Sequence, residues 1–217
     1  MSAEESTELY SRLRYSMVSQ QLRSRGIRDE RVLAAMESVP RHEFAPERYR
    51  GQAYEDHPLP IGEGQTISQP YIVALMLEAL ELLPSDNALE VGTGSGYVTA
   101  LLAELAAHVT SMERHASLAE SARALLQSMG YTNATVVTGD GTRGFPDAAP
   151  YNAIIVSAAA GEMPQALVAQ LAEGGRMIIP VGADDTQQLR LVRFQGGELH
   201  TEFRELCRFV PLISDTP

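Results

Sequence analysis

The stretch LEVGTGSGY, residues 89–97, joins a short apolar strand to an apolar helix and decides the fold class. Gly92, Gly94 and Gly96 carry no Cβ, so the backbone of this turn can approach a ligand closely. The free N–H groups at the start of the following helix point to the same place. The stretch therefore predicts a ligand site at the carboxyl end of the first strand of an α/β sheet.

The spacing of this turn differs from that of the dinucleotide-binding motif, because Tyr97 stands where GxGxxG has its third glycine. Glu90 precedes the first glycine, and a carboxylate there repels a pyrophosphate but attracts a cationic amino group. These two residues favour a nucleoside ligand with a positively charged tail. They make a nicotinamide-dependent dehydrogenase the weakest interpretation.

Two more acids follow the next two strands. Glu113 ends HVTSME about twenty residues beyond the turn, where an acid commonly binds a ribose diol. Asp140, in TGDGT, follows the third strand and is placed to reach an adenine amino group. Taken singly, each acid is equally well a helix cap or a surface charge. Together with Glu90 they predict one site, because ligands of open α/β sheets bind outside the carboxyl ends of the strands.

Alternating strand and helix patterns surround the turn. We predict strands at 87–91, 108–113, 134–138, 151–157 and 176–181, and helices at 97–106, 117–129 and 164–172. Strands separated by helices imply right-handed crossovers and a parallel sheet with helices on both faces. Two more strand-like runs within 187–212 meet at Gly196-Gly197, which predicts an antiparallel hairpin. The expected fold is α/β, with a doubly wound, mostly parallel, seven-stranded Rossmann-like sheet.

The residues before the sheet predict helices and a polar loop. Apolar residues recur at helical spacing over 7–25, Gly26 supplies the stop, and Asp29 is the expected N-cap of a second helix. A loop-rich segment, 41–69, follows. Ser68 is the expected N-cap of the next helix, which has a proline in its first turn and runs to about residue 83.

Composition limits the partners and the compartment. The 217 residues include 28 Asp and Glu against 17 Lys and Arg, so counterion release gives no help at a phosphate backbone and nucleic acid is a poor partner. The single Cys207 excludes an internal disulfide and is expected to be a packed strand residue. The acidic N-terminus is unlike a signal peptide, and the longest apolar run cannot span a bilayer. We expect a cytoplasmic protein without membrane contact, and no metal site, because the five histidines show no close pairing.

Six motifs together resemble one family: LPIGEGQTISQPY, LEVGTGSGY, GDGT, YNAIIVSAA, LAEGGRMIIPVG and RFVPL. They are similar to protein-L-isoaspartate O-methyltransferases, which are class I methyltransferases that use S-adenosylmethionine. The similarity runs from about Val39 to Leu212. It implies an N-terminal helical extension and loop over 1–58 and a catalytic domain over 59–217, which together form one compact unit and a monomer.

The resemblance implies methyl transfer to the free carboxylate of L-isoaspartyl residues in damaged proteins or peptides, with S-adenosylhomocysteine as the second product. A carboxylate with a pKa near 4 is already ionised at neutral pH, so the reaction needs no general base. The protein has to align the reactants and replace water around the carboxylate by fixed donors. An alternative left open is methylation of another carboxylate or a small nucleophile, and a third is a non-enzymatic binder.

Site residues follow from the same resemblance. The expected catalytic residue is Ser68, at the position of the family's active-site serine. The expected substrate-binding residues are Asp56, Thr66, Val210, Pro211 and Leu212, although Asp56 is equally well a loop-positioning or exposed residue and 210–212 equally well a plain final strand. The expected cofactor-binding residues are Ile67, Ser68, Glu90, Gly92, Thr93, Gly94, Gly96, Glu113, Asp140 and Gly141.

One segment departs from the family. Where the family usually has threonine, two alanines, two prolines and glutamate, this chain has SAAAGE, residues 157–162. Two prolines would fix the loop, whereas Ala160-Gly161 is expected to free it, which bears on substrate preference. The segment also lacks the proline pair and aromatic residue typical of adenine amino methyltransferases.

Overall fold

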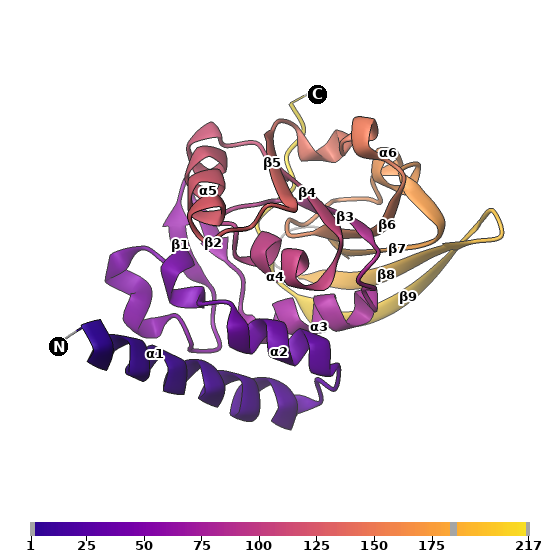
Figure 1. Cartoon of the computed structure of the whole chain (residues 1–217). Helices are drawn as coiled ribbons and strands as arrows, with labels where there is room; N and C mark the ends of the chain where they lie inside the picture. Colours follow the sequence, from indigo (N-terminus) through magenta and orange to yellow (C-terminus); the bar gives the residue numbers. More distant parts are fainter. Residues whose placement is uncertain (1–2, 183–185, 216–217) are drawn as a thin grey trace.

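The computed structural model describes residues 3–182 and 186–215. Its main sheet has seven strands: β3 (Asn87–Val91), β4 (His108–Glu113), β5 (Ala134–Thr138), β6 (Tyr151–Val156), β7 (Leu171–Val181), β8 (Gln187–Gln195) and β9 (Glu198–Cys207). Their order is β5-β4-β3-β6-β7-β8-β9 (Figure 1). The first five are parallel, and β8 and β9 form an antiparallel hairpin with β9 at the edge. The predicted fold class is confirmed.

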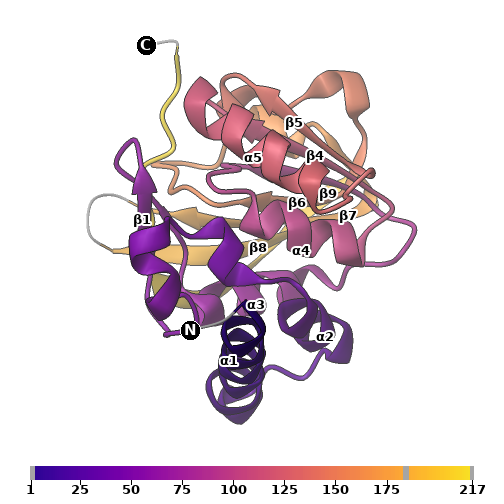
Figure 2. The same cartoon turned by 60° about the vertical axis from the view of Figure 1, so that its left-hand side comes forward.

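Helices cover the two faces of the sheet unequally. They are α1 (Ala3–Ser16), α2 (Glu30–Ser38), α3 (Pro70–Leu80), α4 (Tyr97–Leu105), α5 (Ala116–Ser128) and α6 (Gln165–Val168). Figures 1 and 2 show α1, α2 and α3 gathered on one side of the molecule. Asp29 caps α2 as predicted, because its carboxylate accepts hydrogen bonds from two N–H groups of the first turn. Gly26 ends the first helical segment at φ 105°.

Two buried clusters lie on opposite faces of the sheet, as the period-2 alternation of strands requires. Ile155 and Ile178 belong to the cluster beneath α2, α3 and α4. Their sequence neighbours Ile154 and Met177 belong to the cluster beneath α6. The first cluster also contains Val32 and other side chains from the N-terminal helices. The expected extension and the sheet domain therefore share one core.

A small hairpin occupies the segment that the sequence predicts as loop. Its strands are β1 (Leu59–Gly62) and β2 (Gln65–Ile67). The turn has Glu63 and two glycines at positive φ. Strands of three and four residues give almost no periodic signal, and β1 also contains a proline, so sequence reasoning missed them. At the tip, Glu63 accepts a hydrogen bond from Ser117 Oγ at the start of α5 (2.7 Å).

The N-cap residue of α3 is Gln69 and not Ser68, and Asp56 supplies the hydrogen bond to the first turn. The helix begins at Pro70, and Asp56 Oδ1 accepts the N–H of Tyr71 (3.0 Å) while Oδ2 accepts Nε2 of Gln69 (2.7 Å). The prediction of Ser68 as N-cap is wrong because a carboxylate from an earlier loop satisfies this helix end. The hydroxyl of Ser68 is therefore not needed to cap α3.

The predicted helix at 164–172 is shorter than expected. α6 covers only Gln165–Val168, and β7 begins at Leu171, where it pairs with Tyr151 of β6. Sheet pairing overrides local helix propensity in the second half of that segment.

Candidate functional site

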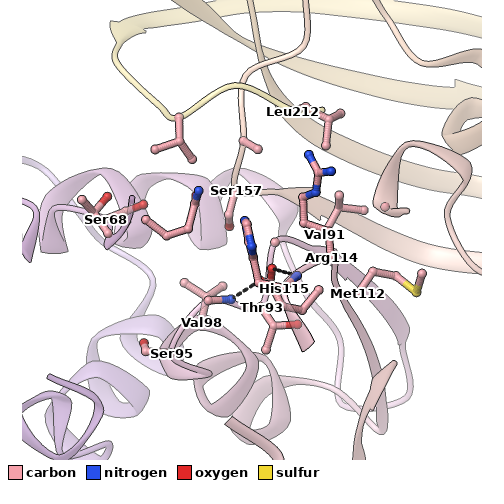
Figure 3. Close-up of a pocket in the computed structure, with 18 of the residues that line it drawn as sticks. Ser68, Val91, Thr93, Ser95, Val98, Met112, Arg114, His115, Ser157 and Leu212 are labelled. Carbon is pink, nitrogen blue, oxygen red and sulfur yellow. Dashed lines mark hydrogen bonds between the residues drawn. The ribbon is translucent and has the colours of Figure 1, made fainter. Parts of the chain in front are cut away.

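A pocket opens at the carboxyl ends of β3, β4 and β6 (Figure 3). The β1–β2 hairpin forms one wall and the segment after β9 forms another. The predicted cofactor-binding residues that line the pocket are Ile67, Ser68, Gly92, Thr93, Gly94, Glu113 and Gly141. The predicted substrate-binding residues that line it are Thr66, Val210, Pro211 and Leu212.

The glycine turn has the backbone that its residues predict. Gly92, Gly94 and Gly96 have φ values of 98°, 54° and 89°, in the left-handed region that glycine adopts without strain. A Cβ at Gly94 would lie 3.2 Å from Cδ1 of Ile61 in β1, so turn and hairpin approach closely. Gly96 is outside the pocket lining. A Cβ there would lie 3.3 Å from Ala122 of α5, so this glycine serves helix packing instead of the predicted ligand contact.

Glu113 holds the turn from the neighbouring strand. Its Oε2 accepts a hydrogen bond from the N–H of Gly94 (2.8 Å) and its Oε1 accepts one from the N–H of His115 (2.9 Å), drawn as dashed lines in Figure 3. The residue is 5% exposed and lines the pocket. Each carboxylate oxygen has a second lone pair, so Glu113 can accept from a ligand hydroxyl while it holds the loop.

Glu90 lies behind the pocket wall and not in it. Its Oε2 accepts hydrogen bonds from Thr99 Oγ1 (2.5 Å) and Ser111 Oγ (2.6 Å), and the residue is 1% exposed. Burial, which outweighs these two hydrogen bonds, raises the pKa of Glu90 to about 8, with a smaller contribution from the charge of Glu113. A largely protonated, enclosed carboxyl is not placed for the predicted contact with a cationic amino group.

Asp140 binds the C-terminal segment of the chain. Its Oδ1 accepts the N–H and Oγ1 of Thr142 (2.9 and 2.6 Å), and its Oδ2 accepts Ser214 Oγ and the N–H of Asp215 (3.3 and 3.1 Å). Burial alone would raise the pKa of Asp140, but these donors hold it below its ordinary value. The carboxylate is outside the pocket lining, while its neighbour Gly141 lines it. The predicted contact of Asp140 with an adenine amino group stays a prediction.

A wider groove meets the pocket at Ser68. The two cavities share Thr66, Ser68, Ser157 and the segment 210–212. Figure 3 shows Ser68 and Ser157 at the pocket from separate segments of the chain. Over the described ranges, Ser68 Oγ donates to no other residue, whereas the Ser68 carbonyl accepts a hydrogen bond from Arg41. Ligands in the pocket and in the groove can therefore meet at a free hydroxyl.

The segment after β9 is fixed beside the loop that follows β6. Ala159 donates its N–H to the carbonyl of Val210 (2.7 Å) and accepts the N–H of Leu212 (2.7 Å). The alternative of a plain final strand is wrong, because β9 ends at Cys207 and residues 210–212 turn to line both cavities. Asp56 lines neither cavity. Its contacts with Arg25, Gln69 and Tyr71 are those of a loop-positioning residue.

Ala160 is held firmly. Its N–H donates to the carbonyl of Pro180 (3.0 Å), its carbonyl accepts the N–H of Gly182 (3.0 Å), and it is 4% exposed. The expectation that Ala160-Gly161 frees the loop is therefore wrong at Ala160. Gly161 is exposed at the wall of the groove.

Several pocket residues escaped the sequence analysis. Ser157 follows β6, Met112 precedes Glu113, and Arg114 and His115 follow it; all line the pocket. The rule that ligands bind at the carboxyl ends of strands would have found them, had it been applied to every residue type and not to acids alone.

The described part of the chain shows neither a metal-binding group of side chains nor a membrane-spanning helix. Within residues 3–182 and 186–215, no group of three or more His, Cys, Asp or Glu side chains is placed to hold a metal ion. No helix in those ranges is long and apolar enough to cross a bilayer. Burial raises the pKa of the Cys207 thiol to about 11, so this partly buried strand residue is a protonated thiol at neutral pH.

Comparisons with known proteins agree with one another. Residues 13–216 match the family model of protein-L-isoaspartate(D-aspartate) O-methyltransferase. A protein-L-isoaspartate O-methyltransferase of Koribacter versatilis is 58% identical, with 93% of this chain and 91% of the relative covered. One of Methanoculleus marisnigri is 56% identical, with 93% and 92% covered. A Plasmodium falciparum crystal structure described under the same activity, in complex with S-adenosyl-L-homocysteine, superposes with a TM-score of 0.81 at 29% identity, over 92% of this chain and 98% of that chain.

Proposed function

Because the chain belongs to the protein-L-isoaspartate(D-aspartate) O-methyltransferase family, we propose that its two connected cavities hold the two reactants. The enzyme transfers a methyl group from S-adenosylmethionine to the free carboxylate of isoaspartyl residues in proteins or peptides. The pocket beside the glycine turn holds the cofactor, and the groove holds the peptide. The observation that carries this division is the free Ser68 hydroxyl at the junction of the two cavities.

The pocket residues fit a nucleoside with a flexible charged tail. Glu113 offers carboxylate oxygens as acceptors to hydroxyl groups. Gly92 and Gly94 have no Cβ, so a ligand can approach their backbone closely. Ile67 and Ser68 close the site from the hairpin side. S-adenosylmethionine supplies an electrophilic methyl group on a sulfonium, and its departure leaves a neutral thioether that needs no proton.

The acceptor carboxylate arrives ionised, so the protein has no proton to remove. Its tasks are to orient one carboxylate oxygen and to replace water by fixed donors. The hydroxyl of Ser68 performs this task without the strong ion pairing that would blunt a nucleophile. The whole sequence contains no lysine, so no lysine side chain can bind the carboxylate in this way.

A methyl-transfer assay tests the proposed function. The wild-type protein is incubated with methyl-labelled S-adenosylmethionine and matched peptides that contain isoaspartate, aspartate or neither. We expect base-labile label on the isoaspartyl peptide alone. A panel of free carboxylic acids in the same assay tests the other-carboxylate alternative. Intact cofactor binding without label on the isoaspartyl peptide would reject the substrate assignment.

We further propose that the protein acts as a cytoplasmic monomer, without nucleic acid, and that residues 1–58 and 59–217 unfold together. The core shared by the N-terminal helices and the sheet supports one cooperative unit. Light scattering after size exclusion tests the monomer, and coincident unfolding transitions by two spectroscopic probes test the single unit.

Glu113→Ala is expected to weaken cofactor binding by about 1.5–3 kcal/mol, because it removes a charged acceptor and also releases the N–H groups of Gly94 and His115. Isothermal titration with S-adenosylhomocysteine measures the change in Kd. Glu120→Ala, an exposed acid on α5, is the control and should bind as the wild type does. An unchanged Kd in Glu113→Ala would contradict the assignment.

A further inference from the structure

Arg41 is a fully buried cation next to the site, and the reaction described above does not use it. It is 0% exposed and begins a short 3-10 turn, Arg41–Phe44, in the N-terminal extension. Its Nε donates to the carbonyl of Ala53 (2.7 Å) and its Nη2 donates to the carbonyl of Ser68 (2.8 Å). Among the described residues, no carboxylate lies within ion-pair distance of Arg41, although the charge of Asp56, which pairs with Arg25, acts on it from farther away, and Nη1 has no hydrogen-bond partner.

The same guanidinium lies against the wall of the cofactor pocket. Its Cζ is 4.8 Å from the ring centroid of Tyr97, which is buried and lines the pocket. A cation over an aromatic face is attracted by the ring quadrupole. Burial lowers the pKa of Arg41, yet a guanidinium is too basic to lose its proton in a folded protein. One charged group therefore touches both Tyr97 at the pocket and Ser68 at the junction.

We propose that Arg41 is a positioning residue for methyl transfer, which fixes the Ser68 peptide group and thereby aims the Ser68 hydroxyl. The proposal rests on the proposed role of Ser68. Burying a cation without a directly paired carboxylate is costly, and removing a buried donor leaves its acceptors unpaired. The carbonyls of Ala53 and Ser68 offset this cost, and they lie 15 residues apart in the chain. Arg41 therefore links two segments just before α3.

Backbone geometry explains how a contact on a carbonyl controls a side chain. A trans peptide is planar, so holding the Ser68 carbonyl fixes the orientation of the whole Ser68–Gln69 peptide group. The next residue is held in turn, because Asp56 accepts hydrogen bonds from the Gln69 side chain and the Tyr71 N–H. Ser68 has no side-chain anchor of its own among the described residues. Arg41 and Asp56 therefore set the place from which its hydroxyl extends.

Two variants of Arg41 test the proposal in the isoaspartyl-peptide assay. Arg41→Met removes both donors, and we expect kcat to fall about tenfold to hundredfold, since small misplacements of reacting groups have effects of this size. The Kd for S-adenosylhomocysteine should stay within about twofold of wild type, because kcat and not cofactor binding depends on the hydroxyl. Arg41→Lys keeps the charge and reaches one carbonyl, so it should recover part of the lost kcat.

Arg176→Met is the matched control. Arg176 is also a buried arginine that donates to backbone carbonyls, those of Leu80, Glu81 and Asn152, and it also pairs with Asp86 at the amino end of β3. Its loss should lower Tm and leave kcat unchanged at temperatures where the variant is folded. An equal kcat loss in Arg176→Met would show a general effect of destabilisation and overturn the proposal.

A double-mutant cycle separates aiming of Ser68 from any other effect. If Arg41 acts through the hydroxyl, Arg41→Lys should lower kcat in the wild type but not in a Ser68→Ala background. Equal kcat losses in both backgrounds, or no loss in either Arg41 variant, would overturn the inference. Wild-type activity is measured in the same experiment, so its absence would instead reject the proposed function.

Discussion

Ser68→Ala is expected to lower kcat by about 10²-fold, the size of effect that follows when a reacting oxygen loses its alignment. The cofactor Kd should remain near that of wild type, because the other pocket residues keep their contacts. The effect is large because the structure leaves this hydroxyl free: Asp56 accepts the N–H of Tyr71 in the first turn of α3, and of Ser68 only the carbonyl forms a hydrogen bond. No other hydroxyl extends from the β2–α3 connection within the pocket lining.

Single-turnover kinetics with the isoaspartyl peptide measure this prediction, and titration with S-adenosylhomocysteine verifies the pocket. Ser121→Ala is a suitable control, since Ser121 is an exposed serine of α5 that bonds only within its own helix. If Ser68→Ala and the wild type have the same kcat, Ser68 takes no part in the reaction. A loss of cofactor binding in proportion to the loss of rate would make it a pocket residue only.

Glu90→Gln is expected to make the protein more stable than wild type at pH 9 and to flatten its pH dependence. Burial raises the pKa of Glu90 from its ordinary 4.5 to about 8 in the folded protein. Between these two pH values the folded chain binds a proton that the unfolded chain does not, so the free energy of unfolding falls as pH rises. The full shift corresponds to at most about 5 kcal/mol at about 1.4 kcal/mol per unit.

Glutamine is neutral at every pH and keeps an oxygen that can accept from Thr99 and Ser111. The difference between variant and wild type should therefore grow from pH 5 to pH 9 and be smallest at the acidic end. Urea unfolding at pH 5, 7 and 9 measures it. For Glu120→Gln, at an exposed site, the free energy of unfolding should depend on pH as it does in the wild type. If Glu90→Gln also has the pH dependence of the wild type, Glu90 is ionised in the folded protein and the argument fails.

The long strands and the glycine turn could be predicted from the sequence because they depend on local rules. Strand alternation, the turn at residues 92–96 and the Asp29 cap each involve neighbours in the chain. The position of Glu90 was predictable by the same alternation: Leu89 and Val91 face one core, so the side chain between them must face the other, beneath α4. The sequence-based prediction rested on the charge of Glu90 and not on the direction of its side chain.

Other features depend on contacts that sequence spacing does not encode. Asp56 reaches Tyr71 from 15 residues earlier, and its position also depends on Arg25. The binding of Asp140 to Asp215 joins residues 75 apart. Such tertiary contacts determine which residue caps a helix or which partner a carboxylate binds, and they cannot be read from the spacing of residues in a single sequence.

The main-chain hydrogen bond of Ala160 limits consensus design of this enzyme. A protein engineer who averages over homologues would insert the proline pair that the family usually carries at this loop. Proline has no N–H, so the carbonyl of Pro180 would lose its donor at the end of β7. The adjoining Gly182 belongs to the groove, and the redesigned loop would therefore alter peptide recognition while intended only to improve rigidity.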